Sequence, residues 1–439
     1  IPDWDYLRDK KDQIRDILMT HGHLDHIGAL PYLLREINPP IFGTPFTLGI
    51  VRRKLEEHEL IGTAQLHEVT PRERLKIGPF ELEFIRVNHS VVDGVGLAIR
   101  TPEGTIVHTG DFKINHTNID GMMTDVSAFA RLGEEGVLVL LSDSTNVEKD
   151  GYTISDQQIG DTLARATDGR TGRIVVAVFA SNIARIQQIV EIAETRQRKI
   201  VFNGRSIENS VSIARELGFL DVPDHMEIGI NEIADYPDDE IIMVTTGSQG
   251  EPMSALARMA AGTHKQIKIK RDDTVILSSK FIPGNEKAIT NIINNLYRRG
   301  ADVIYEKISQ IHVSGHAFRE ELKLMLNLTR PKYFIPVHGE YRHLVLHCRL
   351  AEAVGIPRRN VILTQNGQCV SFGSNGVKKY DLGCTGRVLI DGKGIGDVGR
   401  SVLRERRMLS EEGLVVVNMA FDEETGIVVY GPQLVSRGF

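Results

Sequence analysis

One short segment of the chain carries four side chains that commonly bind metal ions. Residues 21–26 read His-Gly-His-Leu-Asp-His and follow an apolar run. Imidazole and carboxylate are typical ligands of zinc and of similar divalent ions. A single tetrahedral site cannot easily take four ligands from so short a segment, and His21 and His23 can face one way while Asp25 and His26 face another. The pattern therefore predicts two adjacent metals, an arrangement suited to displacement at phosphorus.

Three further candidate ligands stand alone along the chain. His89, Asp111 and His338 each follow a run that is typical of a strand, so their side chains can project from strand ends into one cleft. A single histidine is more often a structural, hydrogen-bonded residue than a ligand, and a His-rich polar loop without metal is the alternative for residues 21–26. The combined set meets the needs of a two-metal site with one bridging carboxylate, which favours the metal centre.

The surrounding sequence predicts two kinds of architecture. The first third alternates short apolar runs with turns, and a helix is expected over 27–35, directly after the first ligands. From about Tyr152 the pattern changes to repeated strand–helix units, which indicate a parallel sheet covered by helices. Further expected elements are helices at 183–196, 206–217, 254–261, 286–298, 320–328 and 342–353, and strands at 80–87, 137–141, 174–179, 199–202, 241–245, 274–278, 333–336, 387–390, 413–419 and 426–430.

Three loops of the strand–helix region are candidates for binding substrate. They follow expected strands, where parallel sheets tend to place ligand sites, and their small polar residues can cradle phosphate oxygens. Plain turns are an equally good interpretation of such sequences. The candidates are Ser181, Asn182, Arg205, Ser206, Gly247 and Ser248.

Composition limits the class of protein. A chain of 439 residues is expected to form two or three domains. Its 41% hydrophobic and 25% charged residues are ordinary for a globular protein, and no apolar stretch approaches the roughly 20 residues that span a bilayer. The three cysteines lack CxxC spacing, which suggests reduced thiols and a cytoplasmic location. The net charge of −6 does not by itself indicate nucleic-acid binding.

The joint motif set resembles a known family. The ligand pattern resembles that of the metallo-β-lactamase superfamily, with the segment 21–26 followed by His89, Asp111 and His338. Ser-Asp-Ser-Thr at 142–145 and His-Val-Ser-Gly-His at 312–316 resemble its β-CASP subgroup, whose members cut nucleic acids. With Thr-Thr-Gly-Ser-Gln-Gly-Glu-Pro at 245–252, Ile-Pro-Gly-Asn-Glu at 282–286 and Pro-Val-His-Gly-Glu-Tyr at 336–341, the chain is similar to the ribonuclease J family along its whole length.

The resemblance implies an α/β fold, a metallo-β-lactamase αββα sandwich with an inserted β-CASP domain. The expected domains are the first part of the sandwich at 1–153, the β-CASP domain at 154–319, and the second part of the sandwich at 320–439. The family also has early strands with a supporting Asp, and a small C-terminal domain. We expect both to be absent from this chain.

The resemblance also implies the roles of the site residues. It places His21, His23 and His89 on one Zn²⁺, and Asp25, His26 and His338 on the second, with Asp111 bridging both; Mn²⁺ and Mg²⁺ are alternatives. Catalysis would use Asp111 and an acid–base pair in which Asp143 orients His316. A substrate phosphate would lie near His312, Ser314, Gly315 and Ala317. His343 and His347, spaced like a metal pair, are expected to form an ordinary helix face.

The implied function is hydrolysis of single-stranded RNA, both endonucleolytic and 5′-to-3′ exonucleolytic, by a homodimer or homotetramer that can join other RNA-degradation proteins and does not bind membranes. Three alternatives stay open. A DNA-acting β-CASP nuclease is disfavoured because a histidine at position 338 goes with RNA in this subgroup. A small-molecule hydrolase of the lactamase or glyoxalase type needs no large insert. A non-catalytic RNA-degradation subunit would be expected to have lost metal ligands, and none of the seven is missing.

Overall fold

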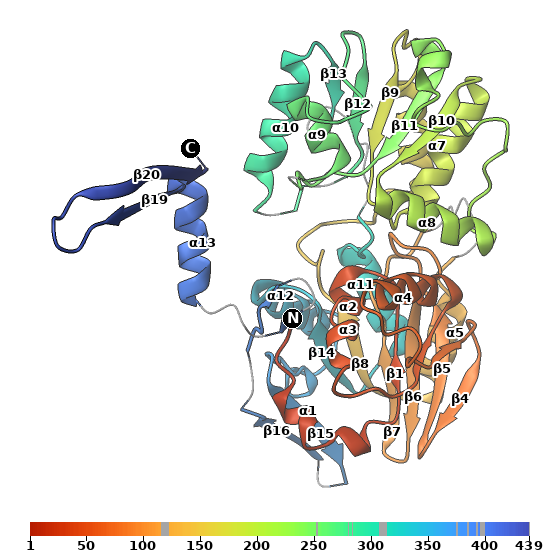
Figure 1. Ribbon diagram of the computed structural model, residues 1–439. Helices are drawn as coiled ribbons and strands as arrows, with labels where there is room; N and C mark the ends of the chain where they lie inside the picture. Colours follow the sequence, from red (N-terminus) through yellow and green to blue (C-terminus); the bar gives the residue numbers. More distant parts are fainter. Residues whose placement is uncertain are drawn as a thin grey trace. The chain divides into compact units, whose positions relative to one another are not determined.

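The chain folds into two compact units. The structure is a computed structural model that describes residues 1–115, 123–251, 253–279, 281–282, 284–306, 314–374, 376–383, 386–391, 394–395 and 400–438. The larger unit comprises Lys10–Leu382, and the smaller unit combines Ile1–Asp9 with Gly383–Phe439 (Figure 1). The expected third domain, 320–439, is therefore divided, because its part beyond Leu382 belongs to the smaller unit.

A six-stranded sheet forms the centre of the half of the larger unit that carries the predicted ligands. Its strand order is β14-β8-β7-β6-β5-β4, in which β4 to β7 run antiparallel and β7, β8 and β14 run parallel. Pairing of β14 with β8 sets Val337 opposite Asp143, so two segments far apart in sequence end side by side. The strands are β4 (Arg74–Ile77), β5 (Phe80–Arg86), β6 (Val95–Thr101), β7 (Gly104–His108), β8 (Val137–Asp143) and β14 (Tyr333–Val337).

Two helical layers and a second sheet complete this half. One face of the large sheet packs on the helices α5 (Val126–Glu135), α11 (Arg319–Thr329) and α12 (Tyr341–Ala353). Its other face contacts a small parallel sheet of β1 (Ile17–Leu18), β2 (Ile41–Gly43) and β3 (Leu66–Glu68). That sheet is covered in turn by α2 (Leu24–Ile27), α3 (Leu30–Leu33) and α4 (Pro45–Glu57). The expected αββα order is confirmed.

The strand–helix repeat forms a separate five-stranded parallel sheet of order β10-β11-β9-β12-β13. Alternate residues of its strands enter two different cores, because successive side chains of a strand point to opposite faces. Figure 1 shows helices on both faces of this sheet. The elements are β9 (Ile174–Ala177), β10 (Lys199–Asn203), β11 (Ile241–Thr245), β12 (Thr274–Leu277) and β13 (Asp302–Ile304), with α6 (Asp156–Ala166), α7 (Ile183–Thr195) and α8 (Arg205–Glu216) on one side and α9 (Ala255–Ala261) and α10 (Glu286–Arg298) on the other.

The remaining elements are short or lie near the carboxyl end. A hairpin of β15 (Gln368–Gly373) and β16 (Gly376–Asp381) closes the larger unit. The smaller unit contains α1 (Asp5–Arg8), β17 (Ile390–Asp391), β18 (Gly394–Ile395), α13 (Arg400–Glu412) and a hairpin of β19 (Leu414–Phe421) and β20 (Val428–Arg437). Four single-turn 3₁₀ helices are η1 (Lys11–Gln13), η2 (Ile233–Asp235), η3 (Asp238–Glu240) and η4 (Arg358–Asn360).

The expected helix over 27–35 is wrong in its extent. The chain instead forms α2 and α3, separated by a turn at Gly28 and Ala29. Pro31 has no N–H to donate to the carbonyl of Ile27, so a continuous helix would lose a hydrogen bond at this point. Among the described helices, none is long and apolar enough to cross a membrane.

Asp93 joins the loop between β5 and β6 to the start of α4. Its carboxylate accepts a hydrogen bond from the backbone N–H of Phe46 at 3.3 Å, and its carbonyl accepts one from the hydroxyl of Thr44 at 2.8 Å. Burial raises the pKa of Asp93 to about 6. Its φ of 63° lies in the left-handed region, which asparagine tolerates well.

We predict that Asp93→Asn stabilises the protein at pH 8 by about 1–2 kcal/mol. The raised pKa means that wild-type stability falls as the pH rises from about 4 through 6, since the folded state resists ionisation of this carboxyl. Asparagine keeps an oxygen for the N–H of Phe46 and cannot ionise. Denaturant unfolding at pH 8 and pH 4.5 checks this, and a gain that does not shrink at the lower pH would contradict the assignment.

Candidate metal centre and acid–base pair

The structure brings all seven predicted ligands together in two groups. His21, His23 and His89 form one, and the other contains Asp25, His26, Asp111 and His338. Within each group the ligand atoms lie within 4.8 Å of one another. The segment 21–26 leaves β1, and the other ligands follow β5, β7 and β14, so the strand ends of the two sheets position the whole set.

Asp111 lies between the two groups. Its Oδ2 is 3.2 Å from His26 Nε2 and 3.4 Å from His338 Nε2, and it is 3.6 Å from His21 Nε2 and 3.9 Å from His89 Nε2. One carboxylate oxygen therefore faces ligands of both groups, which suits a bridging role. The preceding Gly110 has a φ of +61°, and a Cβ there would lie 2.8 Å from the carbonyl oxygen of Val95, so glycine is required for this approach.

The first group fits a borderline divalent cation such as zinc. His21 Nε2 is buried and has no hydrogen-bond partner among the described residues, an arrangement that is unfavourable unless the nitrogen has another partner. Burial lowers the pKa of His21 to about 3 and that of His23 to about 4, so both rings are neutral near pH 7 and carry free lone pairs. Neutral imidazole is the form that binds metal.

A backbone carbonyl fixes the tautomer of His89. Its Nδ1 lies 2.7 Å from the carbonyl oxygen of Gly315, and because a carbonyl only accepts, Nδ1 carries the proton. Nε2 is then left with its lone pair, and it lies 3.0 Å from His23 Nδ1. A Cβ at position 315 would lie 2.7 Å from this ring, so glycine permits the contact.

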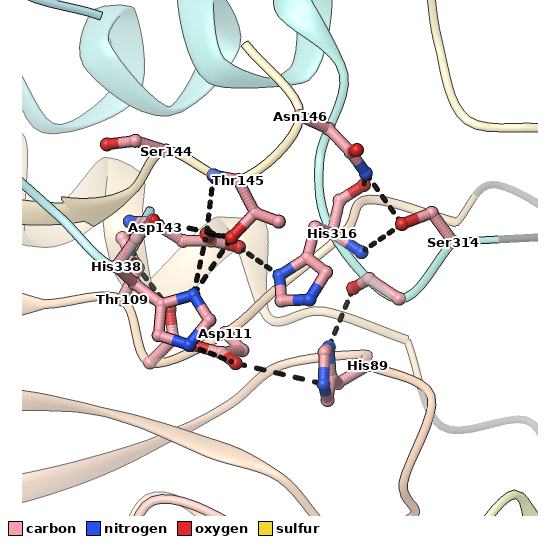
Figure 2. A network of polar contacts seen from close by, with 12 residues as sticks. His89, Thr109, Asp111, Asp143, Ser144, Thr145, Asn146, Ser314, His316 and His338 are labelled. Carbon is pink, nitrogen blue, oxygen red and sulfur yellow. Dashed lines mark hydrogen bonds and ion pairs between the residues drawn. The ribbon is translucent and has the colours of Figure 1, made fainter. Parts of the chain in front are cut away.

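Asp143 and His316 form a close pair beside the ligands, in which Asp143 is buried and His316 is half-buried (Figure 2). His316 Nδ1 lies 2.7 Å from Asp143 Oδ2, and Asp143 is 1% exposed. Burial opposes ionisation of Asp143, but the charge and hydrogen bond of His316 outweigh it and hold the pKa of Asp143 well below its usual range. Burial likewise opposes protonation of His316, but the carboxylate raises the pKa of His316 above its ordinary value. The imidazole is thus favoured as a proton donor.

Thr145 connects this pair to the second ligand group. Its hydroxyl lies 2.7 Å from Asp143 Oδ1, closer than its 3.3 Å distance to the carbonyl of His338, and donates its only hydrogen to that carboxylate. It can then only accept from His338 Nδ1, 2.9 Å away. Nδ1 therefore carries a proton, and Nε2 faces Asp25 and Asp111. Burial lowers the pKa of His338, but hydrogen bonds to Asp143 and Asp25 outweigh this and raise it to about 10. A divalent cation bound at Nε2 would displace the second ring proton and supply positive charge in its place.

The loop that carries His316 is tied to its surroundings. Asn146 Nδ2 donates to Ser314 Oγ at 2.6 Å and to the carbonyl of His316 at 3.0 Å. Ala317 is buried and its N–H donates to the carbonyl of Phe112 at 2.6 Å. The expectation that the Ala317 amide binds substrate is therefore wrong, because that donor is already used. Ser314 is half-buried, and His312 lies outside the described residues.

The predicted loop residues of the five-stranded sheet all follow strand ends, as expected, but differ in accessibility. Arg205 and Ser206 are exposed at the start of α8, and Ser181 is half-buried. Asn182 is buried and its side chain caps α7 by accepting from the N–H of Arg185 at 3.1 Å. Gly247 and Ser248 are also buried. The accessible candidates for contact with a ligand are therefore Ser181, Arg205 and Ser206.

Several residues around the site were not assigned from sequence. Thr145 and Asn146 belong to the motif that identified Asp143, so their polar side chains were an available signal. Thr109 had no signal in the sequence; its hydroxyl accepts from the N–H of Asp143 at 3.2 Å. His347 is fully buried and lies 3.0 Å from the hydroxyl of Ser144, outside the three candidate metal groups found in the described residues.

Comparisons with known proteins identify the family. Residues 3–128 match the model of the metallo-β-lactamase superfamily, 171–296 that of the ribonuclease J β-CASP domain, and 300–362 that of the Zn-dependent metallo-hydrolase RNA specificity domain. The whole chain is 43% identical to Ribonuclease J 1 of Streptococcus pyogenes, of which it covers 78%. The chain belongs to the ribonuclease J family.

Other members are similarly related. Ribonuclease J2 of Bacillus subtilis is 40% identical over the whole chain, which covers 79% of it, and Ribonuclease J of Helicobacter pylori is 42% identical, with 64% of it covered. A crystal structure of a protein of unknown function from Enterococcus faecalis shares the fold alone, with a TM-score of 0.56, 16% identity and coverage of 80% of this chain and 79% of the other.

The comparisons correct one expectation about the carboxyl end. Residues 401–439 match the model of the ribonuclease J C-terminal domain, so the expectation that this domain is absent does not hold. The strands β19 and β20 pair only with each other among the described residues, in the smaller unit. An apolar run in the sequence does not reveal its partner, and these strands were therefore counted with the second part of the sandwich.

We predict that Thr145→Val weakens binding of one divalent ion about 10- to 100-fold, the usual effect of losing a residue that orients a metal ligand. Valine has a similar shape but cannot accept from His338 Nδ1. Titration with Zn²⁺ against a competing chelator measures the change. Ser142→Ala is the matched control, because the hydroxyl of Ser142, on the same strand end, has no hydrogen-bond partner in the described part of the chain. Equal affinities for both variants and the wild type would refute the role of Thr145.

Proposed function

We propose that this ribonuclease J family member is a zinc-dependent hydrolase of phosphodiester bonds in single-stranded RNA. The observation that carries the proposal is the 2.7 Å Asp143–His316 pair beside the two ligand groups, with Asp111 Oδ2 lying 3.6 Å from His21 Nε2 of one group and 3.2 Å from His26 Nε2 of the other. A metal centre alone would suit many hydrolases, whereas a buried acid next to it suits a leaving group that needs a proton. The family relatives, named as ribonucleases, and the match to an RNA specificity domain support RNA as the substrate.

The seven ligands are assigned to two divalent ions. His21, His23 and His89 would hold one, Asp25, His26 and His338 would hold the other, and Asp111, whose Oδ2 faces both groups, would serve both. When bound, such a pair of ions activates water and stabilises charge on a phosphoryl group. Zinc is favoured over magnesium because the set is dominated by imidazole nitrogens, whereas magnesium prefers oxygen ligands.

The chain's own residues would complete the reaction. His316 donates a proton to the 3′ oxygen that leaves phosphorus, and its other ring nitrogen stays hydrogen-bonded to Asp143. Asp143 holds the ring in place and keeps it protonated by its charge. Ser314 and Gly315 lie directly before His316, so they are placed to seat the phosphate of the bond being cut.

The mode of action and the partners belong to the same proposal. We assign the protein both endonucleolytic cleavage and 5′-to-3′ exonucleolytic digestion, with Ser181, Arg205 and Ser206 of the insert contacting the RNA backbone without reading its sequence. The assembly would be a homodimer or homotetramer in the cytoplasm, where the free thiols of Cys348 and Cys369 stay reduced.

One substrate panel tests the proposal. The protein is incubated with Zn²⁺ or Mn²⁺ and 5′-monophosphorylated RNA, 5′-triphosphorylated RNA, single-stranded DNA of the same sequence, or a β-lactam. We expect cleavage of RNA, with mononucleotides released mainly from the monophosphorylated strand. Cleavage of DNA alone, turnover of the lactam with intact RNA, or binding of RNA without any hydrolysis would each overturn it.

Two substitutions separate the acid from the metal ligands. His316→Ala is predicted to lower kcat for RNA about 10²- to 10⁴-fold while the metal content stays unchanged, because proton donation is lost and the ligands remain. His21→Ala is predicted to lower both metal content and activity. Elemental analysis and initial rates give both quantities. His225→Ala, in an exposed position of the insert, serves as the control and should match the wild type; metal loss in His316→Ala would contradict the separation of roles.

A further inference from the structure

A single buried carboxylate outside the metal groups ties together three distant segments. Glu321, in the first turn of α11, is 0% exposed. Its Oε1 accepts from the N–H of Ile114 at 2.7 Å and from the hydroxyl of Thr153 at 2.7 Å. Its Oε2 accepts from the N–H of Thr153 at 2.9 Å and from the N–H of Phe318 at 2.8 Å. Both oxygens are thus fully used.

All four donors are neutral, and Glu321 has no ion-pair partner among the described residues. A carboxylate is expensive to bury unless hydrogen bonds compensate it, so the four bonds form a set that is stable only when every donor is in place. A helix cap needs just the bond from Phe318. The other three bonds reach loops 168 and 207 residues away in the chain, which a cap does not require.

Each of these segments bears on the proposed chemistry. Ile114 lies three residues after Asp111, and Phe318 lies two residues after His316. Thr153 is in the connection that leads from β8, which ends at Asp143, into α6 of the five-stranded domain. Phe318 follows the return from that domain. The Glu321 carboxylate therefore attaches both connections between the two halves of the larger unit, at Thr153 and at Phe318, to the loop that follows Asp111.

A second hydrogen bond joins the loop after Asp111 to the loop that carries His316. The N–H of Ala317 donates to the carbonyl of Phe112 at 2.6 Å, and both residues are buried. This bond joins the same two loops, so Glu321 adds a second point of attachment on the carboxyl side. Two attachments fix both the distance and the angle between the loops, whereas one leaves them free to rotate.

We propose that Glu321 is a positioning residue that sets His316 relative to Asp111. The inference rests on the proposed function, because it concerns the acid and the bridging ligand of the same site. Glu321 touches neither substrate nor ligands; it acts through the backbone of residues 114 and 318. Its removal should therefore impair the step that needs His316 in place more than it impairs binding of RNA or metal.

Glu321→Gln tests this with almost no change in volume. The new amide nitrogen cannot accept, so two of the four donors lose their partner. We expect kcat for 5′-monophosphorylated RNA to fall about 10-fold or more, with KM changed less than about 3-fold and with unchanged metal content. In the His316→Ala background the same substitution should lower kcat less than about 2-fold, since the group being positioned is gone. An equal fold-loss in both backgrounds would overturn the proposal.

The matched control is Asp273→Asn. Asp273 is also a buried carboxylate, with bonds from Arg173 Nε at 3.0 Å and from the N–H of Lys270 at 2.7 Å, but it precedes β12 at the end of the sheet away from the strand-end loops. This variant should lower the melting temperature at least as much as Glu321→Gln and leave kcat near the wild-type value. A similar loss of kcat in the control would mean that the effect is one of general stability.

Amide hydrogen exchange gives a readout that does not need activity. Glu321→Gln should speed exchange together in peptides covering 112–115 and 317–321, and Asp273→Asn should not. If the wild type cleaves no RNA, the proposed function fails, but the exchange rates still test whether Glu321 holds the two loops together. If Glu321→Gln does not fold, Thr153→Val removes one bond and is expected to lower kcat about 2- to 5-fold with the same exchange pattern. Unchanged exchange in both segments would refute the attachment.

Discussion

Two buried carboxylates, Asp111 and Asp143, are the constraint on which the site depends. Each lies at the end of a central strand region, almost without solvent exposure, where an unpaired negative charge is strongly unfavourable. Asp111 is surrounded by four imidazoles, and Asp143 is bound by His316 and by the hydroxyl of Thr145. The positions of these partners follow from the need to compensate the two charges.

Parallel pairing of β8 with β14 makes this compensation geometrically feasible. It places the chain after Val337 directly beside the chain after Asp143, so His338 reaches both carboxylates, at 3.4 Å from Asp111 Oδ2 and 3.5 Å from Asp143 Oδ1. In the sequence, the whole five-stranded domain lies between β8 and β14. The inserted domain thus lies between the strand ends that carry Asp143 and His338, and its return connection brings His316 to the same place (Figure 2).

Much of this site follows from residue type and spacing. The seven ligands were predicted because histidine and aspartate at strand ends have few common alternatives when they occur as a set, and Asp143 and His316 came from motifs of the resembling family. Helices such as α10, at 286–298, and α12, at 341–353, followed from their apolar periodicity. The helix-covered parallel sheet followed from its repeated strand–helix units.

The sequence could not reveal interactions between loops that are far apart in the chain and come together only in the fold. The Ala317 N–H looks free in the sequence, but it bonds to Phe112, about two hundred residues away. Glu321 sits where a helix commonly carries an acidic residue in its first turn, so nothing marked it as buried. Pro31 is a local signal for a break in the helix expected over 27–35, but the prediction followed the apolar periodicity of this segment instead. The carboxyl-terminal hairpin was misassigned because strand patterning is the same in every sheet.

The net charge of −6 also takes on a specific meaning in this arrangement. A polyanionic substrate is not drawn by the protein as a whole, so attraction must arise locally. In the proposed assignment, two divalent ions would carry +4 and Asp25 and Asp111 would contribute −2, so the ligand set would leave about +2 at the centre, while the Asp143–His316 pair is neutral when the imidazole is protonated. Phosphate would therefore be attracted most strongly to the ligand set beside His316.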